Sequence, residues 1–377
     1  MSRGSVPAIA LTLSVCVTAH AQDRPRFRSG VAVTAIDVTA VDNRGRQIPD
    51  LEVAEFAVRV DGTLRRVVNA EWVSRVPGTA GRPIGSASRD GSGANGAADN
   101  GRLVLFVIDQ PNIRFGGAIA HRAAINTFID RLQPSDRVGV VNLGVGGKSV
   151  SFTTDRAKTK QVVSKSVGGV PYPPSSKTAG EQTFNALQTL INDLRSIDAP
   201  KTLVLVSQGL LFSAEARPSF AGLERVAAAA RTAIYALRLD DRASNILQKA
   251  PDARREPSTG LGLEPPAAPP TATREGAGAR SREVPDNPFP EGPAGDRGPD
   301  GVEAGGELYA VATSTGGAMF TVVMSADAAL ARIESESAGY YLLAVESAVT
   351  DGDGRPHSLR VEIGRPGVTA RAARYLP

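Results

Sequence analysis

The chain has 377 residues and a formal net charge of +4, and 41% of its residues are hydrophobic. This composition provides enough apolar residues for two or three folded domains and excludes a wholly disordered chain. The one cysteine is Cys16 and there are three histidines, which excludes disulfide frameworks, thiolate zinc sites and histidine-rich metal sites.

Residues 1–21 have the three parts of a secretory signal peptide. Arg3 supplies a positive start, residues 6–17 are apolar, and Ala19-His20-Ala21 is a small-x-small cleavage pattern. A lipoprotein signal acylated at Cys16 is an alternative that the preceding valine disfavours. No later apolar segment reaches the roughly 20 residues that a membrane-spanning helix needs. We therefore expect an exported protein, periplasmic or secreted, with no transmembrane segment in the mature chain.

Residues 22–76 are predicted to form an N-terminal β segment. Alternating apolar residues predict strands over 31–41, 56–60 and 65–73. Asp61-Gly62 predicts a type I′ hairpin turn between the last two, because that turn needs positive φ at both central positions. Residues 77–101, which are rich in Gly, Ala, Ser and Asn, are expected to be a flexible linker.

From residue 102 to residue 338, strand and helix patterns alternate. Strands are predicted over 103–108, 138–143, 150–152, 203–206, 234–237 and 318–323, and helices over 125–132, 184–197, 223–231, 307–315 and 326–337. This alternation predicts an α/β domain with a doubly wound, mostly parallel sheet and helices on both faces. Residues 241–305 are expected to be a disordered insertion, since residues 251–300 contain 11 of the 26 prolines.

Residues 339–377 are predicted to be a second β segment, with strands over 340–347, 358–363 and 368–375. Asp351-Gly352-Asp353-Gly354 is interpreted as a hairpin turn and not as a calcium loop, because Pro356 stands where that loop requires glycine. A sheet of only three strands is marginal by itself. We therefore predict that segments 22–76 and 339–377 pair into one small β-sandwich.

The strand at 103–108, followed by Asp109 and further strand–helix units, resembles the opening of a von Willebrand factor type A domain. The whole chain resembles the bacterial exported VWFA-related proteins over about 300 residues. The residues that carry this resemblance are Asp42, Gly45, Asp50, Leu51, Phe56 and Asp61-Gly62; Leu308, Ala312, Thr315-Gly316-Gly317 and Phe320; and Tyr340-Tyr341-Leu342, Asp353-Gly354-Arg355 and residues 371–375. The resemblance implies a metal-ion-dependent adhesion site above the carboxyl edge of the sheet.

The residues at the corresponding positions differ from that site. The family's Asp-x-Ser-x-Ser is here Asp109-Gln110-Pro111-Asn112-Ile113. Glu181 falls roughly at the position of the family's Thr, with Thr183 nearby, and Gln208 replaces the second Asp. One carboxylate with neutral amides is a poor Mg²⁺ site. We therefore predict a degenerate site with no metal and no cofactor, in which Asp109 caps the helix that follows it.

Ligands of open α/β sheets bind outside the carboxyl ends of the strands, near the switch in strand order. The candidate ligand-binding residues at this edge are Asp109, Gln110, Asn112, Thr183, Ser207 and Gln208. We expect a non-enzymatic protein-binding module that uses this edge to hold a protein partner. The alternative is a structural scaffold component of a cell-envelope assembly.

Enzymatic and nucleic-acid functions are disfavoured by what the sequence lacks. G-x-S-x-G is absent, and neither His121 nor His357 has a nearby serine or cysteine in a nucleophile-elbow setting. We expect His121 to be a hydrogen-bonded, half-buried residue of a helix face. The arginines are scattered and form no basic block, which disfavours a nucleic-acid partner.

Overall fold

The computed structural model describes residues 32–75, 101–144, 147–169, 177–212, 220–240 and 299–376. They belong to one compact unit, Ala32–Pro377. The predicted signal peptide, the predicted linker up to residue 100, and residues 241–298 of the predicted insertion lie outside the described residues. Within them, no helix is both long and apolar enough to cross a membrane.

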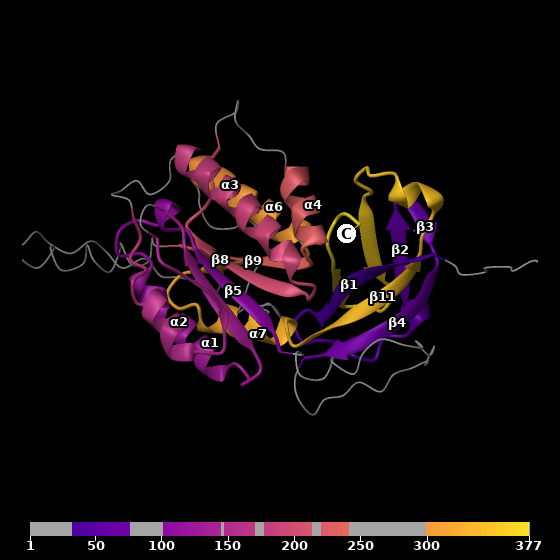
Figure 1. The fold of residues 1–377 in the computed structure, drawn as a ribbon, viewed down its shortest axis with the longest axis horizontal. Helices are drawn as coiled ribbons and strands as arrows, with labels where there is room; N and C mark the ends of the chain where they lie inside the picture. The colour runs from indigo at the N-terminus through magenta and orange to yellow at the C-terminus, as the bar shows by residue number, and fades with distance from the viewer. Residues whose placement is uncertain are drawn as a thin grey trace, which may run out of the picture. The chain divides into compact units, whose positions relative to one another are not determined.

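A six-stranded sheet with helices around it forms the α/β part of the chain (Figure 1). Its order is β10-β9-β8-β5-β6-β7, and every neighbouring pair is parallel except β6 with β7. The strands are β5 (Leu103–Ile108), β6 (Arg137–Asn142), β7 (Ser149–Thr153), β8 (Lys201–Ser207), β9 (Thr232–Leu239) and β10 (Met319–Val322). Every residue of β5 and β8 is buried, as expected for strands covered on both faces. The predicted mostly parallel α/β sheet is confirmed.

Helices cover both faces of this sheet. Successive side chains of β5 point to opposite faces, so Phe106 packs in one core cluster while Leu105 and Val107 pack in the other. The Phe106 face carries α1 (Arg122–Arg131), α2 (Arg156–Val163) and α7 (Asp327–Glu336). The opposite face carries α3 (Lys177–Asp193), α4 (Phe220–Ala229) and α6 (Pro299–Ser314). Short 3₁₀ helices are η1 (Val53–Glu55), η2 (Gln110–Asn112), η3 (Ile119–His121), η4 (Leu194–Ser196) and η6 (Val349–Gly352).

Two helices differ from the sequence-based expectation. Helix α2 was not predicted because most of its residues are polar and it buries only Thr159 and Val163. The helix has little apolar surface to bury, but its N-terminus is capped: the Asp155 side chain accepts a hydrogen bond from the Lys158 N–H. Helix α6 begins at Pro299, so residues 299–305, which we assigned to the insertion, are helical. The three glycines and the proline of that helix conceal its start in the sequence.

The strands of the two terminal segments pair with each other. They are β1 (Val33–Asp42), β2 (Phe56–Val60), β3 (Thr63–Arg65) and β4 (Val67–Ser74) from the first segment, and β11 (Gly339–Glu346), β12 (Leu359–Ile363) and β13 (Val368–Arg371) from the second. One sheet has the order β13-β1-β11-β4 and the other β12-β2-β3. Each sheet therefore contains strands from both ends of the chain.

The two sheets share one hydrophobic cluster around Tyr341. The Tyr341 ring lies 5.1 Å from Phe56 and 5.0 Å from Trp72, measured between ring centroids. Its hydroxyl donates to the Ile48 carbonyl and accepts from the Leu51 N–H, both at 2.8 Å. This tyrosine fixes the connection between β1 and η1 over the core. That the two sheets fold together as an independent β-sandwich stays a prediction.

The two predicted turns have different outcomes. Asp61 and Gly62 both have positive φ, 49° and 77°, and Val60 pairs with Thr63 across them, which confirms the type I′ hairpin. The predicted hairpin at residues 351–354 is wrong, because β11 and β12 belong to different sheets. The connection starts with η6, where the Asp351 carboxylate accepts hydrogen bonds from Arg65 and from the Ala348 N–H.

Candidate functional site

The candidate site lies where the order of the strands reverses. The chain leaves β5 for β6 on one side and later returns to β8 on the other side of β5. Ile108, the last residue of β5, is in register with Val206 of β8. Asp109 and Ser207 follow these two residues and so lie side by side at the carboxyl edge. In open α/β sheets this switch point is the usual place for a ligand.

The carboxylate of Asp109 is the centre of a hydrogen-bonded cluster. The Thr183 hydroxyl donates to Asp109 Oδ1 at 2.6 Å, and the Ser207 hydroxyl donates to Oδ2 at 2.7 Å. The Asn112 side-chain amide donates to both oxygens, at 3.1 and 3.0 Å. The structure thus brings together four of the six predicted residues. All four are at most 1% exposed, so these side chains do not themselves form an open surface.

Burial and hydrogen bonding act on Asp109 in opposite directions. Burial raises the pKa of Asp109 from 3.8 to about 6, against the hydrogen bonds from Thr183, Ser207 and Asn112, which lower it. The folded chain therefore holds a carboxylate that takes up a proton far more readily than an exposed aspartate.

The predicted helix cap at Asp109 is wrong. Asp109 occupies the N-cap position of η2, but its side chain makes no capping bond, because hydroxyl and amide donors occupy both carboxylate oxygens. On α3, the candidate residue Thr183 faces Asp109, although counting along the family motif placed Glu181 roughly at that position. Residues two apart on an α-helix point in nearly opposite directions, so only one of these two can face the cluster.

The two glutamines hold the loop between β5 and α1. Gln208 Oε1 accepts from the Arg114 N–H at 3.0 Å, and Gln110 Oε1 accepts from the Val167 N–H at 3.3 Å. The Gly116 N–H donates to the Val167 carbonyl at 2.7 Å. The backbone is therefore anchored on both sides of Phe115, whose side chain is 73% exposed. Phe115 was not among the predicted site residues, since one exposed aromatic residue leaves no pattern in the sequence.

The histidines have quite different surroundings. His121 is buried, and its Nδ1 has no hydrogen-bond partner among the described residues, contrary to our expectation. Burial lowers the pKa of His121. His357 lies between two carboxylates, with Nδ1 2.7 Å from Asp61 Oδ2 and Nε2 3.1 Å from Asp353 Oδ1. We did not predict this cluster, because Asp61 is 296 positions away in the chain.

The divalent metal that the family resemblance implies does not fit these residues. Asp109 supplies one carboxylate, and both of its oxygens already accept hydrogen bonds. Asn112 Oδ1 has no hydrogen-bond partner among the described residues, but it is a single neutral acceptor. No group of three or more His, Cys, Asp or Glu side chains suited to a metal occurs in the part of the chain that the structure describes. Mg²⁺ prefers an octahedral set of oxygen ligands that this cluster does not provide.

No protein-family model and no curated protein sequence matches the chain. Among solved structures, an aerotolerance-related membrane protein from Bacteroides fragilis is similar over 36% of this chain and 66% of its own, with 10% identity and a TM-score of 0.26. The SpRpn10 VWA domain matches over 41% and 82%, with 13% identity and a TM-score of 0.26. A von Willebrand factor type A protein from Catenulispora acidiphila matches over 59% and 45%, with 12% identity and a TM-score of 0.27. The chain thus spans less than two thirds of the first and third of these proteins.

Proposed function

We propose that this protein is a non-enzymatic protein-binding module that holds a protein partner at the carboxyl edge of its six-stranded sheet without a metal ion. The observation that carries the proposal is Phe115, an exposed aromatic side chain on an anchored loop at the topological switch point. The proposal includes a degenerate type A domain and export of the chain. It is supported by the resemblance of the motifs and by the signal-like residues 1–21.

Phe115 has the properties of an interface anchor. Aromatic side chains that bind in a partner's pocket dominate the binding energy of many protein interfaces. The N–H groups of Arg114 and Gly116 on either side of it are already bonded to Gln208 and to the Val167 carbonyl. The loop therefore loses little backbone freedom when a partner binds. Ile119, which is 47% exposed, adds apolar area on the same loop.

The buried cluster supports this loop from below. Asn112 is the last residue of η2, and its side-chain amide connects Asp109 to Thr183 and to the Ala179 carbonyl of α3. The cluster therefore ties the start of the loop to β5, β8 and α3. We propose that it positions the binding loop and does not itself contact the partner.

The test is site-specific photocrosslinking in the native envelope. A photoreactive phenylalanine analogue replaces Phe115 in one preparation and Leu64 in a matched one, because Leu64 is also an exposed apolar residue, at 60%, on β3. We expect a discrete crosslinked partner at position 115 only. Excess unlabelled wild-type protein should compete for it, whereas the Phe115→Ser variant should not. Equal capture at the two positions contradicts the proposal.

Gln208→Arg separates the binding module from a structural scaffold. This substitution removes the acceptor for the Arg114 N–H and should displace the Phe115 loop while the sheet remains folded. We expect loss of the crosslink at position 115 with an unchanged thermal unfolding midpoint. If the variant assembles and crosslinks like the wild type, the edge is not used and the scaffold function is favoured.

Calorimetric titration with Mg²⁺ and Mn²⁺ tests whether a divalent cation binds at the Asp109 edge. We expect no binding heat for residues 22–377 or for the Asp109→Asn variant. Saturable binding that the variant loses would show that the edge holds a cation, and the metal-free part of the proposal would be wrong.

A further inference from the structure

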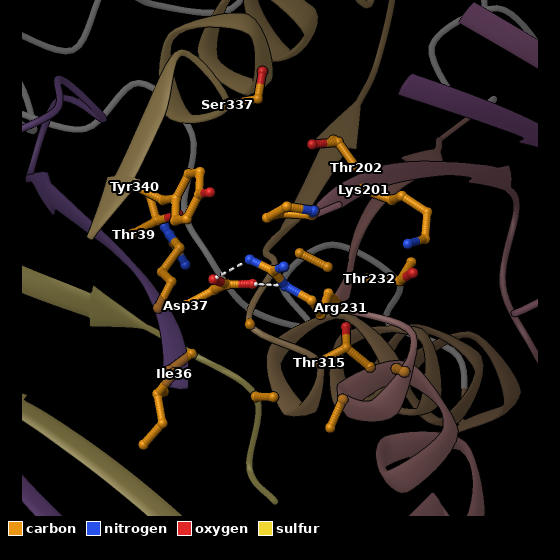
Figure 2. A pocket seen from close by; sticks show the side chains of 18 of the residues that line it. Ile36, Asp37, Thr39, Lys201, Thr202, Arg231, Thr232, Thr315, Ser337 and Tyr340 are labelled. Carbon is orange, nitrogen blue, oxygen red and sulfur yellow. Dashed lines mark hydrogen bonds and ion pairs between the residues drawn. The ribbon is translucent and has the colours of Figure 1, made fainter. Parts of the chain in front are cut away.

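A cavity of about 500 Å³ lies at the amino edge of the six-stranded sheet, opposite to the Asp109 cluster. Figure 2 shows it from close by. Lys201 and Thr232, the first residues of β8 and β9, line it on one side, and Asp37 of β1 lines it on the other. Tyr340 of β11 and Arg371 of β13 also contribute. The cavity therefore exists only when both terminal segments and the central sheet are in place.

The walls combine apolar surface with charge. Three consecutive alanines at the end of α4 (227–229), Ala233, Ile36 and Leu359 supply apolar surface. The charged residues are four cations, Arg75, Lys201, Arg231 and Arg371, and three carboxylates, Asp37, Asp198 and Glu336. The lining thus has one positive charge in excess, four minus three.

Each of the three carboxylates in the wall forms an ion pair with an arginine. The Arg231 guanidinium donates to both oxygens of Asp37 at 2.8 Å, the pair that Figure 2 marks with dashed lines, and to Asp198 at 3.1 Å. Glu336 is paired with Arg371, whose Nε lies 3.1 Å from it, and also accepts from Arg332. All three carboxylates that line the cavity therefore already have a cationic partner.

Lys201 and Arg75 have no carboxylate within ion-pair distance among the described residues. Lys201 is 2% exposed, and its ammonium group donates to the carbonyls of Ile197 and Ala199, at 2.6 and 2.7 Å. An ammonium group has three N–H donors, so one remains for a ligand. Arg75 donates to the Pro200 carbonyl at 3.0 Å and lies over the Tyr340 ring. A buried cation with only neutral acceptors is costly unless an anion joins it.

We propose that this cavity is a binding site for a small organic monocarboxylate with an apolar body, whose carboxylate is held by Lys201 and Arg75. One excess positive charge matches a single negative charge. The alanine-lined wall favours an aliphatic or aromatic body over an inorganic anion. The volume lies within the range of about 300–1,000 Å³ that is typical of small-molecule sites.

The proton affinity of Lys201 agrees with this assignment. Burial, with further repulsion from Arg231, lowers the pKa of Lys201 from 10.5 to about 8. The other charged groups that face it are Asp198, Arg75 and Asp37. A bound carboxylate would stabilise the charged form of Lys201, so ligand binding and proton uptake should be coupled above pH 8.

Calorimetric titration with octanoate tests the site, with octanol as the neutral analogue and inorganic phosphate as the anion without an apolar body. At pH 7 we expect octanoate to bind at least tenfold more tightly than either. Lys201→Met and Arg75→Gln should each weaken octanoate binding about tenfold or more. Lys148→Met, at an exposed lysine on another part of the chain, is the matched control and should have no effect.

The Lys201→Arg variant provides a second test that does not depend on removing the charge. Wild-type affinity for octanoate should fall several-fold to about tenfold from pH 7 to pH 9, whereas Lys201→Arg should keep its affinity because arginine stays protonated. Equal binding of octanoate and octanol, equal binding of phosphate, or unchanged octanoate affinity in folded Lys201→Met and Arg75→Gln would each overturn the proposal. Circular dichroism confirms the folding of every variant.

Discussion

Asp109 is a carboxylate with no solvent exposure whose charge is compensated only by neutral donors. Its pKa of about 6, against 3.8 when unfolded, means that the folded state binds the proton more tightly. The stabilisation from that proton is complete below pH 3.8 and is lost as the pH rises through 6. The rise in pKa from 3.8 to about 6 corresponds to about 3 kcal/mol in the free energy of unfolding, since one pKa unit is about 1.4 kcal/mol.

Replacing Asp109 tests this at one position. Asp109→Asn should remove the pH-dependent contribution between pH 4 and 7 and remain folded, because the amide has nearly the same shape. Asp109→Ala should lower the free energy of unfolding by about 3–5 kcal/mol, since it leaves buried donors of Thr183, Ser207 and Asn112 unsatisfied. Urea unfolding at pH 4, 5.5 and 7 measures both effects. Equal slopes with pH in wild type and Asp109→Asn would contradict the prediction.

The two histidines of residues 22–377 should titrate in opposite directions from the ordinary value of 6.5. The hydrogen bond to Asp61, with that to Asp353, raises the pKa of His357, whereas burial lowers that of His121. The contribution of His357 to stability is therefore full below pH 6.5 and is lost as the pH rises through its higher folded pKa.

Proton NMR of the imidazole signals checks this directly, because only two histidines contribute. We expect one signal to titrate above pH 6.5 and the other below it. Asp61→Asn should move the higher pKa downward and leave the lower one unchanged. Two coincident titrations near 6.5 would show that the Asp61–His357 contact is absent in solution.

Among the secondary-structure elements, α3 carries Thr183 to the Asp109 cluster, and its close packing depends on a glycine. Gly180 in its first turns lies so close to the Leu211 carbonyl that an added Cβ would be 2.0 Å from that oxygen. The helix can therefore approach the segment after β8 only with glycine at this position. Gly306 of α6 differs, since a Cβ there would meet nothing within 4 Å.

Alanine at these two glycines should change stability with opposite signs. Gly180→Ala should lower the free energy of unfolding by about 1–3 kcal/mol, because α3 must move away from the Leu211 carbonyl. Gly306→Ala should raise it by about 0.5–1 kcal/mol, since alanine is the better helix former. Thermal and urea unfolding of both variants measure the effects. If Gly180→Ala is as stable as wild type, the close approach of α3 is wrong.

In the molecule as a whole, the strand order makes the two ends of the chain depend on each other. β1 and β4 come from the N-terminal segment, yet they do not pair with each other, because β11 lies between them. β2 has β3 on one side and β12 on the other. Without residues 339–377, the β2–β3 hairpin is the one pairing between described strands that the first segment retains.

We therefore predict that residues 22–76 do not fold alone. The fragment should show random-coil circular dichroism and poor NMR dispersion, because a two-stranded hairpin is marginal in water. Adding residues 339–377 as a separate peptide should restore strand signal if the two segments form an independent β-sandwich. A cooperative melt of the isolated first fragment would contradict the prediction, and failure of the mixture to fold would show that the sandwich needs the central domain.

The sequence by itself determined most of the elements and the class of the fold, but not α2 or the start of α6. The apolar run at 103–108, the amphipathic pattern of residues 184–197 and the Asp61-Gly62 turn are local signals, because side-chain period and φ preference act over a few residues. The strand–helix alternation also indicated which strands end at the carboxyl edge. The convergence of Asp109, Asn112, Thr183 and Ser207 could be predicted on that basis.

Only the tertiary structure decided how those residues are used. It buried the Asp109 cluster completely and left Phe115 exposed. It also joined Asp61 to His357 and placed Lys201 and Arg75 in the wall of one cavity. Each of these depends on segments separated by many residues in the chain. Burial and pairing of charges are set by such distant neighbours, which no local sequence pattern contains.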